Sequence, residues 1–328
     1  MELSHISPLA PSDPTRPLWS VMIPTYNPNA PYLEQTLKSV LCQGQSAERM
    51  QIEVVDDCST RVDVESLVRS IAGDRVSLSR TPTNLGLQGC WNACIERSRG
   101  IWVHILHQDD YVGAGFYKRL EEMAESHPDV GLVASRSFFV DNEGVITGLT
   151  PRLLSLENGG HEVKEFFYES KLYFPGVAVR RQCYEENGGF RSDLIYALDV
   201  EMWARIIGRA GGLVTPDVLA FYRMHSANQT MRLWRTGEAL TDMMRINALF
   251  SERYAEFDAE TAKRRLVETA RGSEGILAGL GEEEGVRACR EFWRIHAPLD
   301  LKLKVAVKRA ASFTSRAVSW GVRRLFRH

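Results

Sequence analysis

The sequence lacks the features that mark membrane-spanning, secreted or dinucleotide-binding proteins. It has no run of 18 or more apolar residues, so it predicts no membrane-spanning helix, and no charged segment followed by an apolar stretch begins the chain. Its six cysteines form no C-x-x-C pair and fit no zinc spacing, so we expect free thiols in a reducing compartment. Neither G-x-G-x-x-G nor G-x-x-x-x-G-K-[ST] occurs, which argues against dinucleotide and P-loop sites.

The longest segment without an acidic residue is 301–328, which has eight Lys and Arg side chains and no Asp or Glu. The first 300 residues therefore carry 32 basic and 42 acidic side chains, a formal charge of −10 within a chain of −2. A mildly acidic body does not favour nucleic acid as a partner, and we expect none. The 328 residues, 44% of them hydrophobic, suffice for one large domain with additions or for two domains.

Short apolar runs alternate with amphipathic segments in the first part of the chain. Residues 19–23 form a short apolar run typical of a buried parallel strand, and residues 52–55, 76–79 and 101–106 predict further strands. The segments between them place apolar residues at helical spacing. This alternation predicts an α/β fold with a doubly wound, mostly parallel sheet, flanked by helices and joined by right-handed crossovers. In such a sheet, ligands bind beyond the carboxyl ends of the strands.

Composition divides the chain into four parts. Residues 1–17 are rich in Ser and Pro without periodicity and predict a mobile leader. Residues 18–230 hold the α/β pattern, including an irregular stretch at 141–160, and residues 231–300 form a helical, charge-rich extension. Residues 301–328 predict a basic amphipathic helix that lies on an anionic membrane surface, with a helix packed on the body or a disordered tail as alternatives.

Two acidic pairs follow two predicted strands. Asp56-Asp57 comes after residues 52–55, and Asp109-Asp110 comes after residues 101–106. Each pair alone fits a helix cap as well as a binding site. Two pairs at equivalent strand ends would repel each other unless a cation lies between them, and carboxylate oxygens suit Mg²⁺ or Mn²⁺. The two pairs together therefore favour a divalent-metal site over capping.

Four further residues have both a functional and a structural interpretation. Asp199 lies at the start of an amphipathic helix. It fits either a general base or an ordinary acidic residue of a helix first turn. His225 fits a metal ligand or a structural histidine, and Arg223 fits a phosphate contact or a solvated cation. The backbone of the loop at Asn84 could approach a phosphate closely, or the loop is only a turn.

Six segments in order resemble the family-2 glycosyltransferases of the GT-A fold. They cover about residues 18–230 and comprise Pro-Thr-Tyr-Asn at 24–27, Val-Asp-Asp-Cys-Ser at 55–59, Asn-Leu-Gly at 84–86, His-Gln-Asp-Asp at 107–110, Gly-Gly-Phe at 188–190 with Asp-Val-Glu-Met-Trp at 199–203, and Arg-Met-His at 223–225. Such enzymes transfer a sugar from a nucleoside-diphosphate donor. The resemblance is closest to transferases of bacterial surface polysaccharides.

The resemblance implies a donor site at the first three segments. Tyr26 would contact the nucleobase ring and Asp57 would hydrogen-bond to it. Pro24 and Asn84 belong to the motifs that line this site, and Arg223 would contact the diphosphate.

The resemblance also implies a metal site and a base. Asp110 would ligate a divalent cation, Mn²⁺ or Mg²⁺, that bridges the diphosphate, and Asp109 would contact the ribose or the metal. His225 would complete the metal or diphosphate site. Asp199 would take the proton from the acceptor hydroxyl, and in-line attack would invert the anomeric carbon.

The sequence departs from the family pattern at three positions. His107 stands at the first position of the acidic motif, Trp91 replaces a common arginine, and Leu198 replaces a glutamate. Asp109 and Asp110 remain as metal ligands, whereas a ligand role at position 107 is in doubt. Loss of the arginine would leave the diphosphate charge to the metal or to Arg223.

These observations predict an inverting, metal-dependent glycosyltransferase of bacterial cell-surface polysaccharide assembly. Its partners would be a nucleoside-diphosphate sugar, a glycan or lipid-linked acceptor and an anionic membrane surface, which predicts a cytoplasmic enzyme peripheral on the inner face of the membrane. The alternatives are a nucleotidyltransferase, or a non-catalytic nucleotide-sugar-binding module on a membrane surface. A nucleotidyltransferase would be expected to carry a Gly-rich basic loop after the first strand, where the sequence has Pro24-Thr-Tyr-Asn-Pro28.

Overall fold

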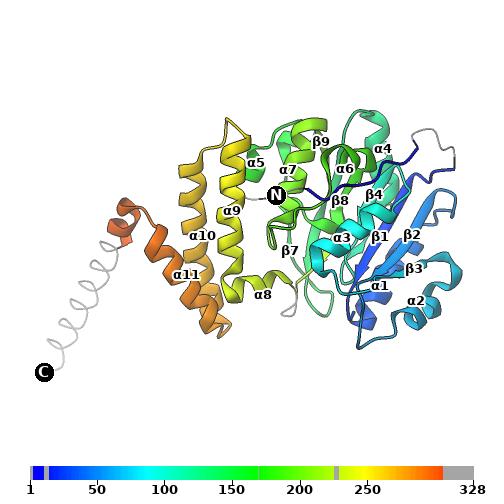
Figure 1. Ribbon diagram of the computed structural model, residues 1–328, viewed down its shortest axis with the longest axis horizontal. Coiled ribbons are helices and arrows are strands. Elements are labelled where there is room, and N and C mark those ends of the chain that lie inside the picture. The colour runs from blue at the N-terminus through cyan, green and yellow to red at the C-terminus, as the bar shows by residue number, and fades with distance from the viewer. Residues whose placement is uncertain (1–2, 11–14, 169, 225–228, 306–328) are drawn as a thin grey trace, which may run out of the picture.

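The computed structural model describes residues 3–10, 15–168, 170–224 and 229–305. Within them the strands form one nine-stranded sheet (Figure 1). Its first half has the order β3-β2-β1-β4, and all neighbours there are parallel. The strands are β1 (Trp19–Thr25), β2 (Met50–Asp56), β3 (Ser77–Arg80) and β4 (Trp102–Ile105). The α/β alternation predicted from the sequence is confirmed here.

The second half of the sheet is mixed rather than parallel, unlike the mostly parallel sheet that we predicted. Its order after β4 is β8-β6-β9-β5, with antiparallel pairs except for β6 and β9, and β7 pairs with β6 in antiparallel fashion. The stretch 141–160, expected to be irregular, contains β7. These strands are β5 (Tyr111–Val112), β6 (Leu132–Val140), β7 (Ile146–Leu149), β8 (Val177–Arg180) and β9 (Gly212–Arg223).

Helices cover both faces of the sheet because each presents one apolar stripe to it. One face packs against α1 (Ala30–Leu41), α2 (Val64–Ala72) and α4 (Phe116–Ser126). The other face packs against α3 (Gly86–Arg97), α6 (Arg181–Asn187) and α7 (Leu198–Ala210). Local capping signals determine where these helices begin. Helix α1, for example, begins after Asn29, whose side chain accepts a hydrogen bond from the N–H of Tyr32.

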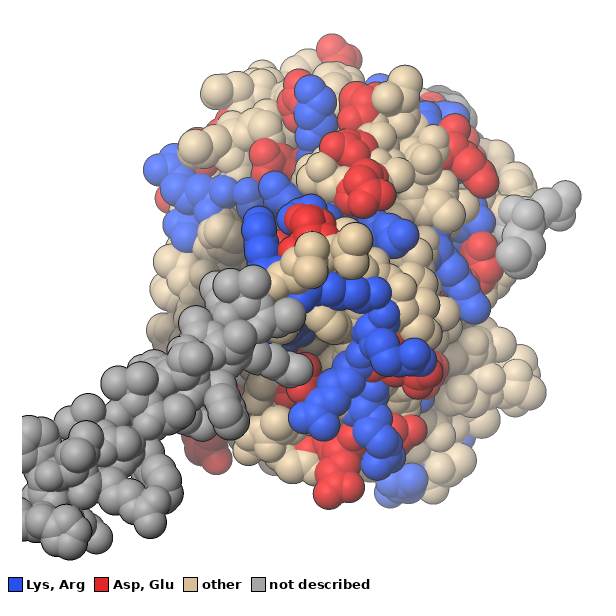
Figure 2. Space-filling model, turned by 90° about the vertical axis from the view of Figure 1, so that its left-hand side faces the viewer, with Lys and Arg blue, Asp and Glu red and all other residues tan. Residues whose placement is uncertain are grey.

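The C-terminal part of the described chain is helical, as predicted. It consists of α8 (Gln229–Thr236), α9 (Glu238–Arg253), α10 (Ala259–Gly279) and α11 (Glu283–His296), and the short α5 (Lys164–Tyr168) lies against α10. Their shared apolar cluster includes Leu240, Leu266 and Leu277. Seen from this end, basic and acidic side chains are interspersed (Figure 2), as in the ion pairs of Arg264 with Asp300 and of Arg290 with Glu274.

Residues 3–10 pack on the body, which differs from the mobile leader that composition predicts. Ile6 is 1% exposed within the cluster that includes residues of α3 and α6. The backbone N–H of Ser7 donates to Glu96, and the N–H of Gly189 donates to the carbonyl oxygen of Ser4. A single buried isoleucine and a few backbone hydrogen bonds leave little trace in composition, which explains the difference.

None of the helices in the described residues combines the length and the apolar character that crossing a bilayer would require. Most of the predicted basic helix, residues 306–328, lies outside the described residues.

Candidate active site

The loops after β1 and β2 are held in an unusual backbone conformation at the carboxyl edge of the sheet. Asn27 and Cys58 both have positive φ, at 44° and 62°. Such angles are costly for residues other than glycine and persist where surrounding contacts enforce them. Here the Asn27 side chain accepts hydrogen bonds from the N–H groups of Thr60 and Arg61, both at 2.9 Å. The two loops are thereby joined into one platform.

Asp57 joins this platform to the start of α3. Its carboxylate accepts hydrogen bonds from the backbone N–H groups of Leu85 and Gly86, at 2.7 and 3.0 Å, and from the Thr81 hydroxyl. The Asn84 side chain in turn donates to the carbonyl oxygen of Asp57. Asp57 thus accepts hydrogen bonds at the start of α3 rather than capping the next helix, α2, whose N-cap is Asp63, and the structure brings Asp57 and Asn84 together.

Tyr26 and Pro24 differ in their access to solvent. The Tyr26 side chain is 46% exposed directly after β1, whereas Pro24 is buried within that strand, paired with Val55. Gln108 accepts from the N–H of Tyr26 at 2.9 Å and donates to its carbonyl oxygen. Pro24 can therefore only shape the site, whereas Tyr26 is available to a ligand. Gln108 is a contributor that sequence analysis missed, and its place beside Asp109 was the signal.

Asp109 and Asp110 lie where the chain leaves β4 and crosses to β5, four places along the sheet. Asp110 is 1% exposed, and its Oδ1 accepts a hydrogen bond from the backbone N–H of Arg223 at 2.8 Å. Its Oδ2 is buried, has no hydrogen-bond partner among the residues that the structure describes, and lies 3.8 Å from Nδ1 of His107. Burial raises the pKa of Asp110 well above its usual range, and the neighbouring Asp109 adds to the effect. Such a carboxylate is suited to a cationic ligand.

Arg223 stabilises the turn that carries Asp109 and Asp110. Its buried guanidinium donates to the backbone carbonyl oxygens of Asp109 and Asp141, at 3.0 and 2.8 Å, and to the Gln35 side chain. It also lies over the Tyr32 ring, 4.3 Å from the centroid. The donors are engaged by protein atoms rather than presented to a phosphate, which differs from the direct diphosphate contact implied by the resemblance.

His107 is part of an aromatic stack. Its ring lies parallel to that of Trp91, with centroids 5.2 Å apart, and Phe174 contacts both rings. Burial lowers the pKa of His107 to about 4, so the imidazole is neutral at pH 7. The two departures from the family pattern, Trp91 and His107, therefore occur together and contact each other. Sequence analysis noted each one but had no means of pairing them.

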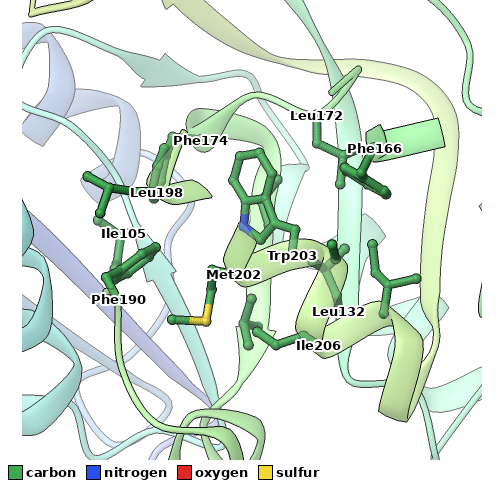
Figure 3. Close-up of a cluster of buried hydrophobic side chains, with 14 of the residues drawn as sticks. Ile105, Leu132, Phe166, Leu172, Phe174, Phe190, Leu198, Met202, Trp203 and Ile206 are labelled. Atoms are coloured by element: carbon green, nitrogen blue, oxygen red, sulfur yellow. The ribbon is translucent and has the colours of Figure 1, made fainter. Parts of the chain in front are cut away.

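Asp199 occupies the first turn of α7, which is held by a large apolar face. Trp203, one turn further on, is 1% exposed and packs against Phe174 with ring centroids 5.2 Å apart (Figure 3). Burial raises the pKa of Asp199 to about 7, while the N–H of Val200 donates to its Oδ1 at 2.8 Å and opposes the shift. A carboxylate with this pKa is matched to a general base at neutral pH.

Two tyrosines connect the Asp199 region with the Asp109–Asp110 turn. Burial raises the pKa of Tyr196 to about 12, with a further contribution from the charge of Asp199. Burial also raises the pKa of Tyr222, and the charges of Asp110 and Tyr196 add to it. The charge of Asp199 therefore acts on one of these tyrosines, and the charge of Asp110 acts on the other.

Only part of the predicted metal site can be evaluated. His225 lies outside the described residues. Among the residues described, no three His, Cys, Asp or Glu side chains come together as a ligand cluster. Mg²⁺ and Mn²⁺ in nucleotide sites, however, are often held by one or two carboxylates together with substrate phosphates. The unpartnered Oδ2 of Asp110 beside Asp109 fits a site of this kind.

Comparison with known proteins agrees with this geometry. The family model "Glycosyl transferase family 2" matches residues 20–187, about half of the chain, so the protein belongs to this family. An uncharacterised protein of Mycobacterium tuberculosis is 31% identical over 71% of this chain and 76% of its own length. An uncharacterised glycosyltransferase of Methanocaldococcus jannaschii is 25% identical over 58% of this chain and 65% of its own length.

Solved structures confirm the GT-A fold. Staphylococcus aureus TarS 1–349 in complex with UDP-GlcNAc matches with a TM-score of 0.58 and 19% identity, over 76% of this chain and 70% of that one. The mannosyltransferase PcManGT of Pyrobaculum calidifontis, in complex with GDP-Man and Mn²⁺, matches with a TM-score of 0.57 and 19% identity, over 95% and 85%. The latter match extends into the C-terminal helices.

Proposed function

We propose that this glycosyltransferase moves a sugar from a nucleoside-diphosphate sugar to an acceptor hydroxyl, with inversion at the anomeric carbon. The observation that carries the proposal is Asp199, whose pKa of about 7 suits proton removal at neutral pH. A sugar hydroxyl is a weak nucleophile until a base takes its proton. Asp199 would accept that proton as the hydroxyl oxygen attacks the anomeric carbon opposite the departing nucleoside diphosphate.

The donor would bind at the carboxyl edge of the sheet. The exposed Tyr26 ring offers a surface for the nucleobase, and Asp57 holds the loop at residues 84–86 in place beside it. Two solved structures of similar fold support this, because TarS and PcManGT form complexes with UDP-GlcNAc and GDP-Man. Asp57 would act on the nucleobase through this loop, or it would accept a further hydrogen bond from the nucleobase itself.

Asp110 and Asp109 would hold a divalent metal together with the donor diphosphate. Mn²⁺ in the related PcManGT complex supports this choice of ion. When bound, such an ion stabilises the negative charge that develops on the leaving diphosphate. Arg223 would contribute by keeping both carboxylates in place rather than by contacting the diphosphate.

The acceptor is proposed to be a glycan or lipid-linked glycan of bacterial cell-surface polysaccharide assembly. TarS, a relative 29% identical over 39% of this chain and 22% of its own length, is named a poly(ribitol-phosphate) β-N-acetylglucosaminyltransferase. The predicted basic helix at 301–328 would bring the enzyme to the inner face of the membrane, where a lipid-linked acceptor is found.

Donor consumption by the full chain tests this function. The protein is incubated with a panel of nucleoside-diphosphate sugars and Mn²⁺, and release of the nucleoside diphosphate is measured with and without candidate acceptors. We expect one donor to be turned over by the native chain and by Asp217→Asn, an exposed control site on β9. Asp199→Asn should lower turnover by about 10²-fold or more while retaining donor binding. Equal turnover by Asp199→Asn would contradict the proposed base.

A further inference from the structure

A buried carboxylate of the C-terminal helices holds the segment in front of Asp199. Asp242, in the second turn of α9, is fully buried, and its Oδ2 accepts three backbone hydrogen bonds. The donors are the N–H groups of Ile195, Tyr196 and Ala197, at 3.2, 2.8 and 2.8 Å. Three donors that converge on one oxygen fix the path of this segment, because charge-assisted bonds are about twice as strong as neutral ones.

A second side chain of the same helical region reaches the same segment. The indole N–H of Trp234, on α8, donates to the Tyr196 hydroxyl at 3.1 Å. The two rings meet edge to face, with centroids 6.0 Å apart and planes at 85°. Contacts from α8 and α9 therefore meet on residues 195–197, although all of them lie outside the match to the family model at 20–187.

These contacts fix the segment that leads into α7. Ala197 is the N-cap residue of α7 and has no side-chain oxygen, so α7 starts without a side-chain cap. Asp242 supplies an acceptor for the backbone at this point from another part of the chain. Residues 195–197 lead directly into the first turn of α7, where Asp199 lies.

We infer that Asp242 is a positioning residue for the base Asp199, so that helix α9 takes part in the transfer reaction from outside the catalytic region. This inference rests on the proposed function of Asp199. Misplacement of a reacting group by about 1 Å can lower the rate by about 10²-fold. The C-terminal helices are thereby assigned a role in orientation of the base, in addition to their packing.

The same carboxylate affects the proton affinity of the base. The pKa of Asp199 is raised first by burial and then by the charge of Asp242. The titratable groups that face Asp199 are Asp242 from α9 and Tyr196 from the preceding segment. Arg245 lies near Asp242, with its Nη1 3.8 Å from Oδ1, and partly offsets that charge. Removal of the charge at 242 should therefore lower the pKa of the base.

The test compares Asp242→Ala, Asp242→Asn and Trp234→Phe in the full chain. Asp258→Asn is the matched control, because Asp258 also accepts bonds from two backbone N–H groups and a hydroxyl, at the start of α10. We expect Asp242→Ala to lower kcat by about 10²-fold with the donor KM changed less than about 2-fold. Asp242→Asn retains an acceptor for the N–H groups, so it should recover most of kcat and shift the acid limb of the pH–rate profile to lower pH.

The outcomes separate positioning from simple stability. Loss of donor binding in parallel with kcat, or an acid limb unchanged in Asp242→Asn, would overturn the inference. If Asp242→Ala does not fold, Asp242→Asn and Trp234→Phe decide, since the first retains the side-chain volume and the second retains an aromatic ring without the indole N–H. Trp234→Phe should lower kcat with donor KM retained. If native protein shows no transfer, or Asp199→Asn is fully active, it is the proposed function that fails. Native activity with unaffected Asp242 variants rejects only the inference.

Discussion

The backbone N–H of Arg223 donates to Oδ1 of Asp110 at 2.8 Å, while Oδ2 of the same carboxylate is buried and has no hydrogen-bond partner in the described part of the chain. One oxygen is thus fixed by the protein, and the other is left for a ligand. Burial without a partner is costly for a carboxylate, and a bound cation removes that cost. This arrangement makes a specific prediction for metal-dependent binding of the donor.

Asp110→Ala should abolish the metal-dependent part of nucleotide binding. With Mn²⁺ present, a nucleoside diphosphate at about 100 times its Kd should stabilise the native chain by about 2.7 kcal/mol. Without Mn²⁺ the same nucleotide concentration should stabilise it less. Thermal unfolding with a panel of nucleoside diphosphates, with and without Mn²⁺, measures this. Asp217→Asn is the control that should behave as the native chain. A Mn²⁺-dependent shift that persists in Asp110→Ala would contradict the assignment of this carboxylate.

Arg223→Lys discriminates between the two roles considered for this residue. As the structure has it, the guanidinium holds the carbonyl oxygens of Asp109 and Asp141, and lysine has no planar fork to hold both. Each buried acceptor left unsatisfied costs about 1–3 kcal/mol, so a variant that leaves one of the two unsatisfied should lose about 1–3 kcal/mol. Urea denaturation measures the loss. A variant of native stability with weakened diphosphate binding would instead favour the direct contact predicted from the sequence.

Much of the fold could be predicted because its signals are local. Strands β1, β2 and β4 contain short apolar runs between helical patterns, β3 follows in the same alternation, and their parallel arrangement fits right-handed crossovers. The mixed half of the sheet depends on long-range pairing instead. Strand β5 is only Tyr111 and Val112, and it is defined by its pairing with β9 more than a hundred residues later. No local pattern could have revealed it.

The site shows the same division. The motifs identified Asp110 and Asp199 because short polar segments at strand and helix ends are visible in the sequence. The supports of these residues were not visible: Arg223 acts through its backbone and its guanidinium, and Asp242 lies in a helix where an acidic residue is ordinary. Such roles depend on tertiary contacts, which a single sequence does not encode in any local pattern.

The raised pKa of Asp199 predicts opposite effects of pH on activity and on stability. Below pH 7 the carboxylate takes up a proton, so kcat should fall as pH decreases, with an acid limb near pH 7. Above pH 7 the folded chain carries a buried charge that costs less in the unfolded chain, where the usual pKa of an aspartate is about 3.9. Stability contributed by the protonated group is therefore present at low pH and lost as pH rises through about 7.

Asp199→Asn removes this stability cost along with the base. We expect the variant to unfold at a higher temperature than the native chain at pH 8, with a difference that diminishes as pH falls toward 4. Thermal unfolding across this range measures the difference. A constant difference at every pH would mean that the carboxyl group titrates at its ordinary value, and the assignment as a base at neutral pH would lose its support.

Replacement of His107 by the acidic residue of the family pattern tests the aromatic stack. His107→Asp loses ring contacts with Trp91 and Phe174 and places a second carboxylate near the buried Oδ2 of Asp110. Since both changes are unfavourable, we expect a loss of at least about 2 kcal/mol without metal, part of which Mn²⁺ should restore. His107→Asn removes the ring without adding charge, so the difference between the two variants isolates the electrostatic part. Equal stability of the two variants without metal would show that the charge is tolerated there.

The basic segment 301–328 predicts binding to an anionic membrane surface. Each Lys or Arg near such a surface contributes about 1 kcal/mol, so Gln at positions 309, 316, 323 and 324 should weaken binding by about 4 kcal/mol, or about 10³-fold. Sedimentation with vesicles that contain anionic lipid measures this for the native chain and the four-residue variant. Neutral vesicles should retain neither protein, because the attraction is electrostatic and decreases with salt. If the two proteins bind anionic vesicles equally, the segment does not act as a membrane contact, and packing on the acidic body becomes the better explanation of its charge.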